Sequence, residues 1–325
     1  MSNMMTASRP KFSVAIQTDG YKKLINNTLQ DPKRAQRFVA SVSSMVATTP
    51  ALQECDAGTI LTGALLGEAL NLTPSPQLGQ YYLVPFNNKI KLPDDTYEEH
   101  KVATFVLGYK GYIQLALRTG QYRKINVMSV KKGELISFDP FNEEISLNPI
   151  FDPIEREAAE TVGYYAMFEY INGFRKVIYW SREKMISHAD RYSAAFNSGA
   201  TKGRHPKYDK VSFADYQTGN YPKGSEWLYS SFWYKDFDGM AHKTLLRQLI
   251  SKWGIMSTEL QQAFEADGQL VRQDGTVEMV DTAMPDMHAM EALPPQAAIE
   301  VGQASAIAAE SAPAGQQSAM SLNDV

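Results

Sequence analysis

The chain has 325 residues, of which 44% are hydrophobic and 11% aromatic, and its formal net charge is −4. This composition excludes a wholly disordered chain, which would combine low hydrophobicity with a high net charge. The one cysteine cannot form an intramolecular disulfide, and we find neither a signal-like apolar stretch at the N-terminus nor an apolar run of about 18 residues. We therefore expect a folded cytoplasmic protein without a membrane segment.

The charge is distributed unevenly along the chain. Residues 1–257 hold 31 Lys and Arg against 25 Asp and Glu, whereas residues 258–325 hold one Arg against 11 acids. The first part therefore carries +6 and the second −10. Such asymmetry predicts a basic body that meets an acidic polymer, followed by an acidic tail. A solvated surface is the alternative interpretation.

The N-terminal third is predicted to be helical. Residues 1–30 are polar and weakly periodic, which predicts an arm or a marginal helix. Asp31 and Pro32 then suit the cap and first position of a helix that runs to about Thr48. A second helix, over about residues 56–71, is ended by the TPSP sequence.

Strands begin at Tyr81. The β-forming segments YYLVPF and KVATFVLG flank the polar insertion NNKIKLPDDTYEEH, and GYKGYIQLALRTG follows as a helix closed by Gly120. Further strand patterns occur in RKINVMSVKKG and ELISF. The segment ETVGYYAMFEYINGFRKVIYWS predicts a hairpin with a type I′ turn at Asn172-Gly173.

The last part of the folded region is again predicted to be helical. Ser181 opens a helix to about Ser193, residues 195–225 read as a long mobile loop, and two helices fall within residues 226–253. The pattern predicts an α+β fold in which an antiparallel sheet and hairpins pack with helices. We expect an N-terminal arm over residues 1–30, a core over 31–257 and an acidic, largely disordered tail over 258–325.

Basic and aromatic residues are interleaved in the middle of the chain. Lys110, Gln114 and Arg118 are spaced by four and share one helix face. Phosphates require cations, and unpaired bases stack on flat rings. Glycine-flanked cations around residue 202 suit a loop that closes over a phosphate backbone. The candidate DNA-binding residues are Lys110, Tyr112, Gln114, Arg118, Tyr122, Arg123, Lys124, Lys131, Lys132, Lys202, Arg204, Lys207, Tyr208, Lys210, Lys243 and Arg247.

Each of these signals has a structural alternative. The tyrosines, Tyr112 included, can simply pack their helix on its sheet, and the loop over residues 202–210 can be a solvated surface. Lys243 and Arg247 are weaker candidates, because long basic side chains also cover apolar surface at helix edges.

Enzyme motifs are missing from the sequence. Gly219 and Gly224 have the spacing of a phosphate-binding loop, but Ser225 and Glu226 replace the required Lys and Ser or Thr. The histidines form no HExxH pattern, and one cysteine cannot build a zinc cluster. We therefore expect no catalytic residue, metal or cofactor. The remaining enzymatic alternative is a nuclease that holds Mg²⁺ on the acidic pairs Asp94-Asp95, Glu98-Glu99 and Glu143-Glu144.

The order of motifs resembles the RecT family of phage and prophage recombination proteins. The resemblance rests on YYLVPF, a polar insertion, TFVLGYKGYIQLALRTGQYRKINVMSVKKGE and the hairpin strands that follow, and it spans about residues 35–255. It implies annealing of complementary single strands without ATP, assembly into rings or filaments in a bacterial host cell, and an architecture similar to the Rad fifty-two annealing core. It also implies a phage exonuclease or the host single-strand-binding protein as partner, and by the same resemblance the acidic tail would contact it.

The expected partners are therefore single-stranded DNA, the annealed duplex and further copies of the chain, with the helices at residues 32–48 and 56–71 as possible interface pieces. We expect the first strand to lie with its backbone on the cations and its bases turned outward, so that Watson–Crick pairing selects the sequence. Two alternatives stay open: the Mg²⁺-dependent nuclease, and a phage structural or scaffolding protein whose cations are only surface.

Overall fold

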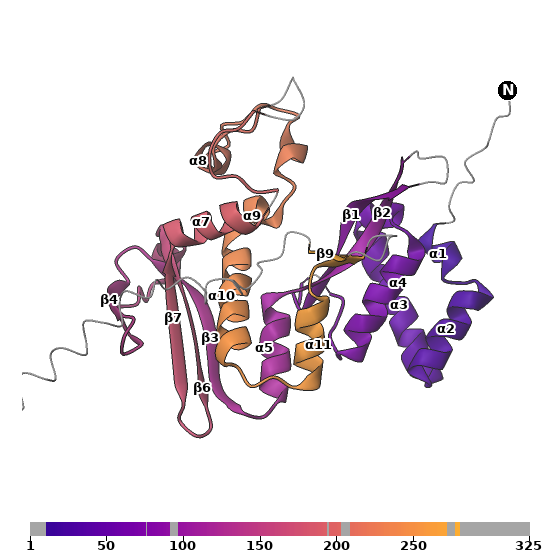
Figure 1. Ribbon diagram of the computed structural model, residues 1–325, viewed down its shortest axis with the longest axis horizontal. Helices are drawn as coiled ribbons and strands as arrows, with labels where there is room; N and C mark the ends of the chain where they lie inside the picture. The colour runs from indigo at the N-terminus through magenta and orange to yellow at the C-terminus, as the bar shows by residue number, and fades with distance from the viewer. Residues whose placement is uncertain are drawn as a thin grey trace, which may run out of the picture. The chain divides into compact units, whose positions relative to one another are not determined.

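The computed structural model describes residues 11–75, 77–91, 97–193, 195–202, 209–271 and 277–279. All of them belong to one compact unit, Met1–Pro285. Their arrangement is α+β with antiparallel sheets, as the sequence predicts (Figure 1). The predicted disorder of residues 280–325 falls outside the described residues.

Helices form the first part of the unit. The two predicted helices are confirmed, because Asp31 accepts a hydrogen bond of 2.9 Å from the Lys33 amide and Asp56 accepts one of 2.8 Å from the Gly58 amide. Residues 12–15 and 19–29 form helices, the second of the two alternatives predicted there, and Ile25 and Leu29 of the longer helix are buried. The elements are α1 Phe12–Ala15, α2 Asp19–Leu29, α3 Pro32–Thr48, η1 Pro50–Glu54 and α4 Ala57–Ala69.

A long antiparallel ribbon follows these helices. Strand β1, Tyr81–Lys91, pairs with β2, Tyr97–Leu107, so that Tyr81 lies opposite Leu107. Helix α4 packs against β2. Helix α5, Tyr109–Arg118, follows β2 and is closed by Gly120, whose φ of +69° is the left-handed conformation that the sequence predicted there.

The second sheet has three antiparallel strands in the order β3-β6-β7, formed by Tyr122–Lys131, Thr161–Tyr170 and Arg175–Ser181. Helix α10, Phe237–Trp253, packs against all three strands (Figure 1). A small hairpin of β4, Leu135–Asp139, and β5, Glu144–Leu147, contributes apolar side chains to a second cluster around Val130 and Tyr165. Strands β3 and β7 are therefore the two edges of this sheet.

The turn between β6 and β7 differs from the predicted type. A type I′ turn requires positive φ at both central residues, but of Asn172 and Gly173 only Gly173 has one, at +86°. The Tyr170 amide donates to the Phe174 carbonyl at 2.8 Å, and the Asn172 side chain accepts a bond of 3.0 Å from the Phe174 amide. The hairpin is confirmed, but its loop is longer than predicted.

The remaining elements extend the fold beyond its predicted end. The loop expected over residues 195–225 contains α8, and its Phe196 and Phe213 are buried in the core. Helix α11 begins directly after residue 257, where the tail was expected, and its Leu260 is buried. These elements are α6 Pro153–Ala158, α7 Arg182–Tyr192, α8 Phe213–Gln217, η2 Glu226–Tyr229, α9 Phe232–Lys235, α11 Thr258–Ala266, β8 Gln269–Val271 and β9 Val277–Met279.

Candidate nucleic-acid interface

The three residues predicted to share one face of α5 differ in the contacts that they make. Lys110 and Gln114 are exposed. The guanidinium of Arg118, in contrast, donates hydrogen bonds of 2.7 Å to the carbonyls of Leu70 and Asn71, at the C-terminal end of α4. Carbonyls at a helix end lack partners within the helix. Arg118 is itself exposed, but its guanidinium serves the packing of α4, and its predicted contact with phosphates stays a prediction.

Three further candidates lie in the interior. Tyr112 is fully buried, and its hydroxyl donates to Asp267 at 2.7 Å and accepts from Arg247 at 3.1 Å. Lys243 and Arg247 are also buried, and they donate to the Asp267 carboxylate at 3.0 and 2.6 Å. Burial is the main cause that raises the pKa of Tyr112 well above its usual value, followed by the Asp267 charge. These side chains support the fold, which corrects their interpretation as DNA contacts.

The candidates on and beside β3 are mostly exposed. Tyr122 is buried, and its hydroxyl donates to the Ile255 carbonyl at 3.1 Å, so that it too packs the core and cannot offer its ring to a base. Arg123 and Lys124 are both exposed, and Arg123 lies 3.1 Å from Glu169. Lys132 is exposed as well and lies 4.0 Å from Glu160, an ion pair that solvent and salt weaken.

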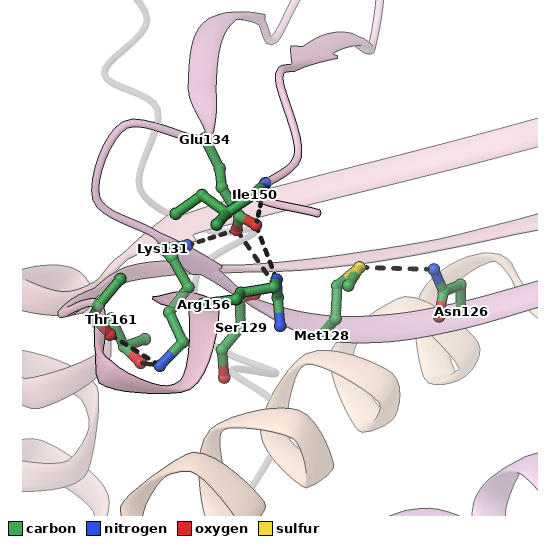
Figure 2. A network of polar contacts seen from close by, with 9 residues as sticks. Asn126, Met128, Ser129, Lys131, Glu134, Ile150, Arg156 and Thr161 are labelled. Atoms are coloured by element: carbon green, nitrogen blue, oxygen red, sulfur yellow. Dashed lines mark hydrogen bonds and ion pairs between the residues drawn. The ribbon is translucent and has the colours of Figure 1, made fainter. Parts of the chain in front are cut away.

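The end of β3 is held by a polar network around Glu134 (Figure 2). Its carboxylate accepts hydrogen bonds from Arg156 Nε and from the Lys131 amide, both at 2.7 Å, and Arg156 also donates to the Ser129 carbonyl at 2.8 Å. Burial opposes ionisation of Glu134, but these hydrogen bonds outweigh it and lower its pKa. The ammonium of Lys131 donates to the Thr161 hydroxyl at 3.1 Å and to the Ala159 carbonyl at 3.0 Å. Helix α6 and β3 are thereby fixed to each other.

A cavity of about 400 Å³ lies beside this network. The Tyr109 and His242 rings are 5.6 Å apart, and His242 Nε2 lies 3.0 Å from the Ser129 hydroxyl. Burial lowers the pKa of His242 more than the carboxylates of Asp238 and Asp236 raise it, which favours a neutral imidazole. The cavity is lined by Tyr109, Val127, Met128, Ser129, Lys131, Pro153, Arg156, Glu157 and His242.

Aromatic rings gather with Lys110 at the start of α5. The Lys110 ammonium lies 5.9 Å from the centroid of the Tyr109 ring, and the Tyr82 and Phe232 rings are 6.2 Å apart. Phe232 is 40% exposed. We call Lys110, Tyr109, Tyr82 and Phe232 the α5 cluster. Tyr82 and Phe232 could not be predicted as site residues, because no local pattern in the sequence indicates that β1 and α9 bring their rings together.

Two glycines allow α5 to approach β1 closely. A Cβ atom at Gly108 would lie 2.1 Å from the Gly79 carbonyl oxygen, and one at Gly111 would lie 2.1 Å from the Gln80 carbonyl oxygen. Only glycine fits such an approach of backbone to backbone. The i, i+3 glycines of GYKGY were therefore a readable signal for the packing that forms the α5 cluster.

The glycine-rich loop is only partly described. Lys202 is exposed. Lys210 pairs with Thr201 in an isolated antiparallel bridge, and its ammonium donates to the Ala195 carbonyl at 2.7 Å and lies 5.1 Å from the Tyr234 ring centroid. Arg204, Lys207 and Tyr208 lie outside the described residues. The predicted closure of this loop over a phosphate backbone therefore stays a prediction.

Among the described residues, no group of three or more His, Cys, Asp or Glu is arranged to hold a metal ion. In the same part of the chain, no helix is both long and apolar enough to cross a lipid bilayer.

The fold is α+β, with an antiparallel sheet backed by one long helix. Exposed lysines lie at its β3 edge and at the start of α5. The model of the RecT family matches residues 36–282, and the chain belongs to this family. The match continues through α11, beyond the region in which the motifs alone carry the resemblance.

Two relatives cover most of the chain. It is 34% identical over 249 residues to "Uncharacterized protein YqaK" of Bacillus subtilis (strain 168), an alignment that covers 77% of this chain and 68% of the relative. It is 27% identical over 233 residues to "Protein RecT" of Escherichia coli (strain K12), which covers 72% of this chain and 71% of the relative. Membership of the RecT family places the chain among phage-type recombination proteins that anneal DNA strands.

Proposed function

We propose that the chain binds single-stranded DNA on the α5 cluster and the exposed lysines of the β3 edge, and anneals a complementary strand to it as an oligomer, without ATP. Lys110, Lys124 and Lys132 contact phosphates, and the rings of Tyr82, Tyr109 and Phe232 contact bases. This set replaces the predicted Tyr112, Arg118, Lys243 and Arg247, whose polar groups are bonded within the fold.

The observation that carries the proposal is the placement of Lys110. Its side chain is exposed beside Tyr109, and within the described residues it has no ion-pair partner. A cation beside aromatic rings offers both interactions that a single strand needs, since each stacked base contributes about 1–3 kcal/mol and each neutralised phosphate releases counterions.

Annealing by these contacts requires no nucleotide cofactor such as ATP. Contacts to phosphates and to base faces leave the Watson–Crick edges of the first strand free, so that base pairing with the second strand supplies both the selection and the driving force. Many weak sites along one strand need several copies of the chain, and a head-to-tail contact between copies produces a ring or a filament. The acidic residues after Met279 would serve contacts with an exonuclease or a single-strand-binding protein.

The direct test is the salt dependence of binding to a fluorescent oligonucleotide. Lys110→Glu should weaken binding to all sequences and lower the slope of log K against log salt by about 0.7 per lost phosphate contact. Lys23→Glu on α2, an exposed lysine outside the proposed surface, makes the same change in net charge and should leave the slope unchanged. A folded Lys110→Glu protein with the wild-type slope would remove the α5 cluster from the site.

Annealing and nuclease activity can be separated in one assay. Wild-type protein should convert two complementary labelled oligonucleotides into duplex in the presence of EDTA and without ATP. Loss of the labelled strand only when Mg²⁺ is supplied would instead support the nuclease alternative. Negligible binding of an oligonucleotide at low salt would support a structural protein.

A further inference from the structure

Three lysines from three different elements gather on two tryptophans at the β7 edge of the sheet. The Lys176 ammonium lies 4.1 Å from the Trp253 ring centroid, and the Lys252 ammonium lies 5.9 Å from the same centroid. The Lys184 ammonium lies 4.5 Å from the Trp180 ring centroid. Strand β7, helix α7 and the end of α10 thus each contribute one lysine. The polar face of a single amphipathic helix would not bring these three lysines onto the two tryptophans.

The charges of this group are only partly compensated. Lys176 forms an ion pair with Glu143. For Lys184 and Lys252, no carboxylate lies within ion-pair distance in the described part of the chain. Burial lowers the pKa of Lys184, and the positive charge of Lys252 lowers it further. Two neighbouring ammonium groups repel each other, and an anion bound beside them would relieve this repulsion.

The indole rings fix where the cations lie. A lysine placed over a tryptophan face is attracted by the negative potential of the ring. This interaction restricts side chains that would otherwise sample many rotamers, so that less entropy is lost when a ligand binds. The arrangement suits a chain of regularly spaced anions, such as a phosphate backbone, better than one isolated ion.

We infer that Lys184 and Lys252, held on Trp180 and Trp253, bind the backbone of the second DNA strand during annealing. The inference rests on the proposed function, which places the first strand at the α5 cluster and the β3 edge. Strand β7 is the opposite edge of the same three-stranded sheet, two interstrand spacings or about 10 Å away. Two strands are both polyanions, so a separate cationic track lowers the repulsion that the incoming strand meets.

The test separates capture of the second strand from binding of the first. In Lys184→Gln/Lys252→Gln, the affinity for a single labelled oligo-dT and its salt slope should equal those of wild type. The rate of annealing to a complementary oligonucleotide should fall at least several-fold, and the salt slope of that rate should decrease by about 1.4, since about 0.7 is expected for each of two lost phosphate contacts. Lys184→Arg/Lys252→Arg keeps both charges and should restore the rate.

Matched controls make each outcome decisive. Lys22→Gln/Lys23→Gln removes two exposed lysines of α2 and should leave annealing unchanged. If Lys184→Gln/Lys252→Gln anneals at the wild-type rate, the inference is wrong while the proposed function stands. The inference is also wrong if the variant loses affinity for oligo-dT, because the lysines then belong to the first-strand site. It is wrong as well if the variant loses only the binding of an acidic peptide such as residues 280–325, because the ligand is then a peptide and not a DNA strand. Failure of the wild-type protein to bind or anneal any oligonucleotide would instead refute the proposed function.

Discussion

The Tyr112 hydroxyl donates a hydrogen bond of 2.7 Å to the carboxylate of Asp267, 155 residues further along the chain. The same carboxylate accepts a bond of 2.8 Å from the Leu107 amide and forms ion pairs with two buried cations of α10, Lys243 and Arg247. Asp267 therefore ties the end of α11 to β2, α5 and α10. This contact makes α11 part of the folded core.

Asp267→Ala should destabilise the protein by about 3–5 kcal/mol, because removing one partner of a buried ion pair leaves the others charged and uncompensated. The free energy of unfolding in urea measures the loss. Glu265→Ala, an exposed acid of the same helix, should change stability by less than about 0.5 kcal/mol. Equal stability of the two variants would show that the buried cluster contributes nothing.

Truncation tests the same contact independently. A chain that ends at Met279 keeps α11 and Asp267 and should unfold cooperatively with near-native stability. A chain that ends at Ser257 loses both and should unfold at a much lower urea concentration, as judged by circular dichroism. If the shorter chain were as stable as the longer one, the boundary predicted from composition would be the correct one after all.

Tyr112→Phe distinguishes packing from stacking. The ring is kept, so a role in stacking on bases would be retained, whereas the loss of the hydroxyl removes a buried hydrogen bond of Asp267 and should cost about 1–3 kcal/mol. We expect lower stability and an unchanged dissociation constant for oligo-dT, measured by anisotropy under conditions where the variant is folded. Native stability of Tyr112→Phe would contradict the structural role, because a ring that only stacks on bases has no need of the hydroxyl.

Local signals were sufficient for most of the secondary structure. Asp31 was predicted as a helix cap and accepts the expected hydrogen bond, and Gly120 has the expected left-handed geometry. Each of these features depends on a few neighbouring residues. They could be predicted because the physical cause lies within one turn of the chain.

The candidate site was harder to predict, because its residues are selected by contacts distant in sequence. Arg118 and Arg247 look like surface cations in an amphipathic pattern, and only the partners 48 and 20 residues away show that their guanidinium groups are hydrogen-bonded within the fold. Asp267 lies in an acidic, aromatic-poor region whose average composition indicates disorder. Composition describes a window of sequence and cannot identify one buried carboxylate within it.

Arg118 and Lys110 should respond differently although they share one helix face. Arg118→Gln removes two hydrogen bonds from the end of α4 and should cost about 1–3 kcal/mol of stability, since bonds to a charged donor are stronger than average. It should leave the salt slope of DNA binding unchanged. Lys110→Gln should have the reverse effect, with a lower slope and native stability. Urea unfolding and salt titration of both variants give the comparison.

His242 should make stability depend on pH. The folded state keeps a pKa below the reference value of 6.5, chiefly through burial. As the pH falls through about 6.5, His242 therefore binds a proton in the unfolded chain but not yet in the folded chain, and the free energy of unfolding decreases. Wild-type protein should lose more stability between pH 7.5 and 5.5 than His242→Gln, as measured by urea midpoints at the two pH values. Parallel pH profiles would show that the imidazole is not held neutral.

The close approach of α5 to β1 predicts opposite effects for two glycine substitutions. Gly108→Ala places a Cβ atom 2.1 Å from the Gly79 carbonyl oxygen, which forces the backbones apart and should cost at least about 1–3 kcal/mol. Gly20→Ala in the first turn of α2 meets no atom within 4 Å, and it should be neutral or stabilise the helix by up to about 1 kcal/mol. Because Lys110 and Tyr109 move with α5, Gly108→Ala should also weaken oligo-dT binding where the protein is still folded, whereas Gly20→Ala should not. Thermal unfolding measures the change in stability, and anisotropy measures the change in oligo-dT binding. If Gly108→Ala has native stability and native affinity, the close contact at Gly108 is not needed to form the α5 cluster.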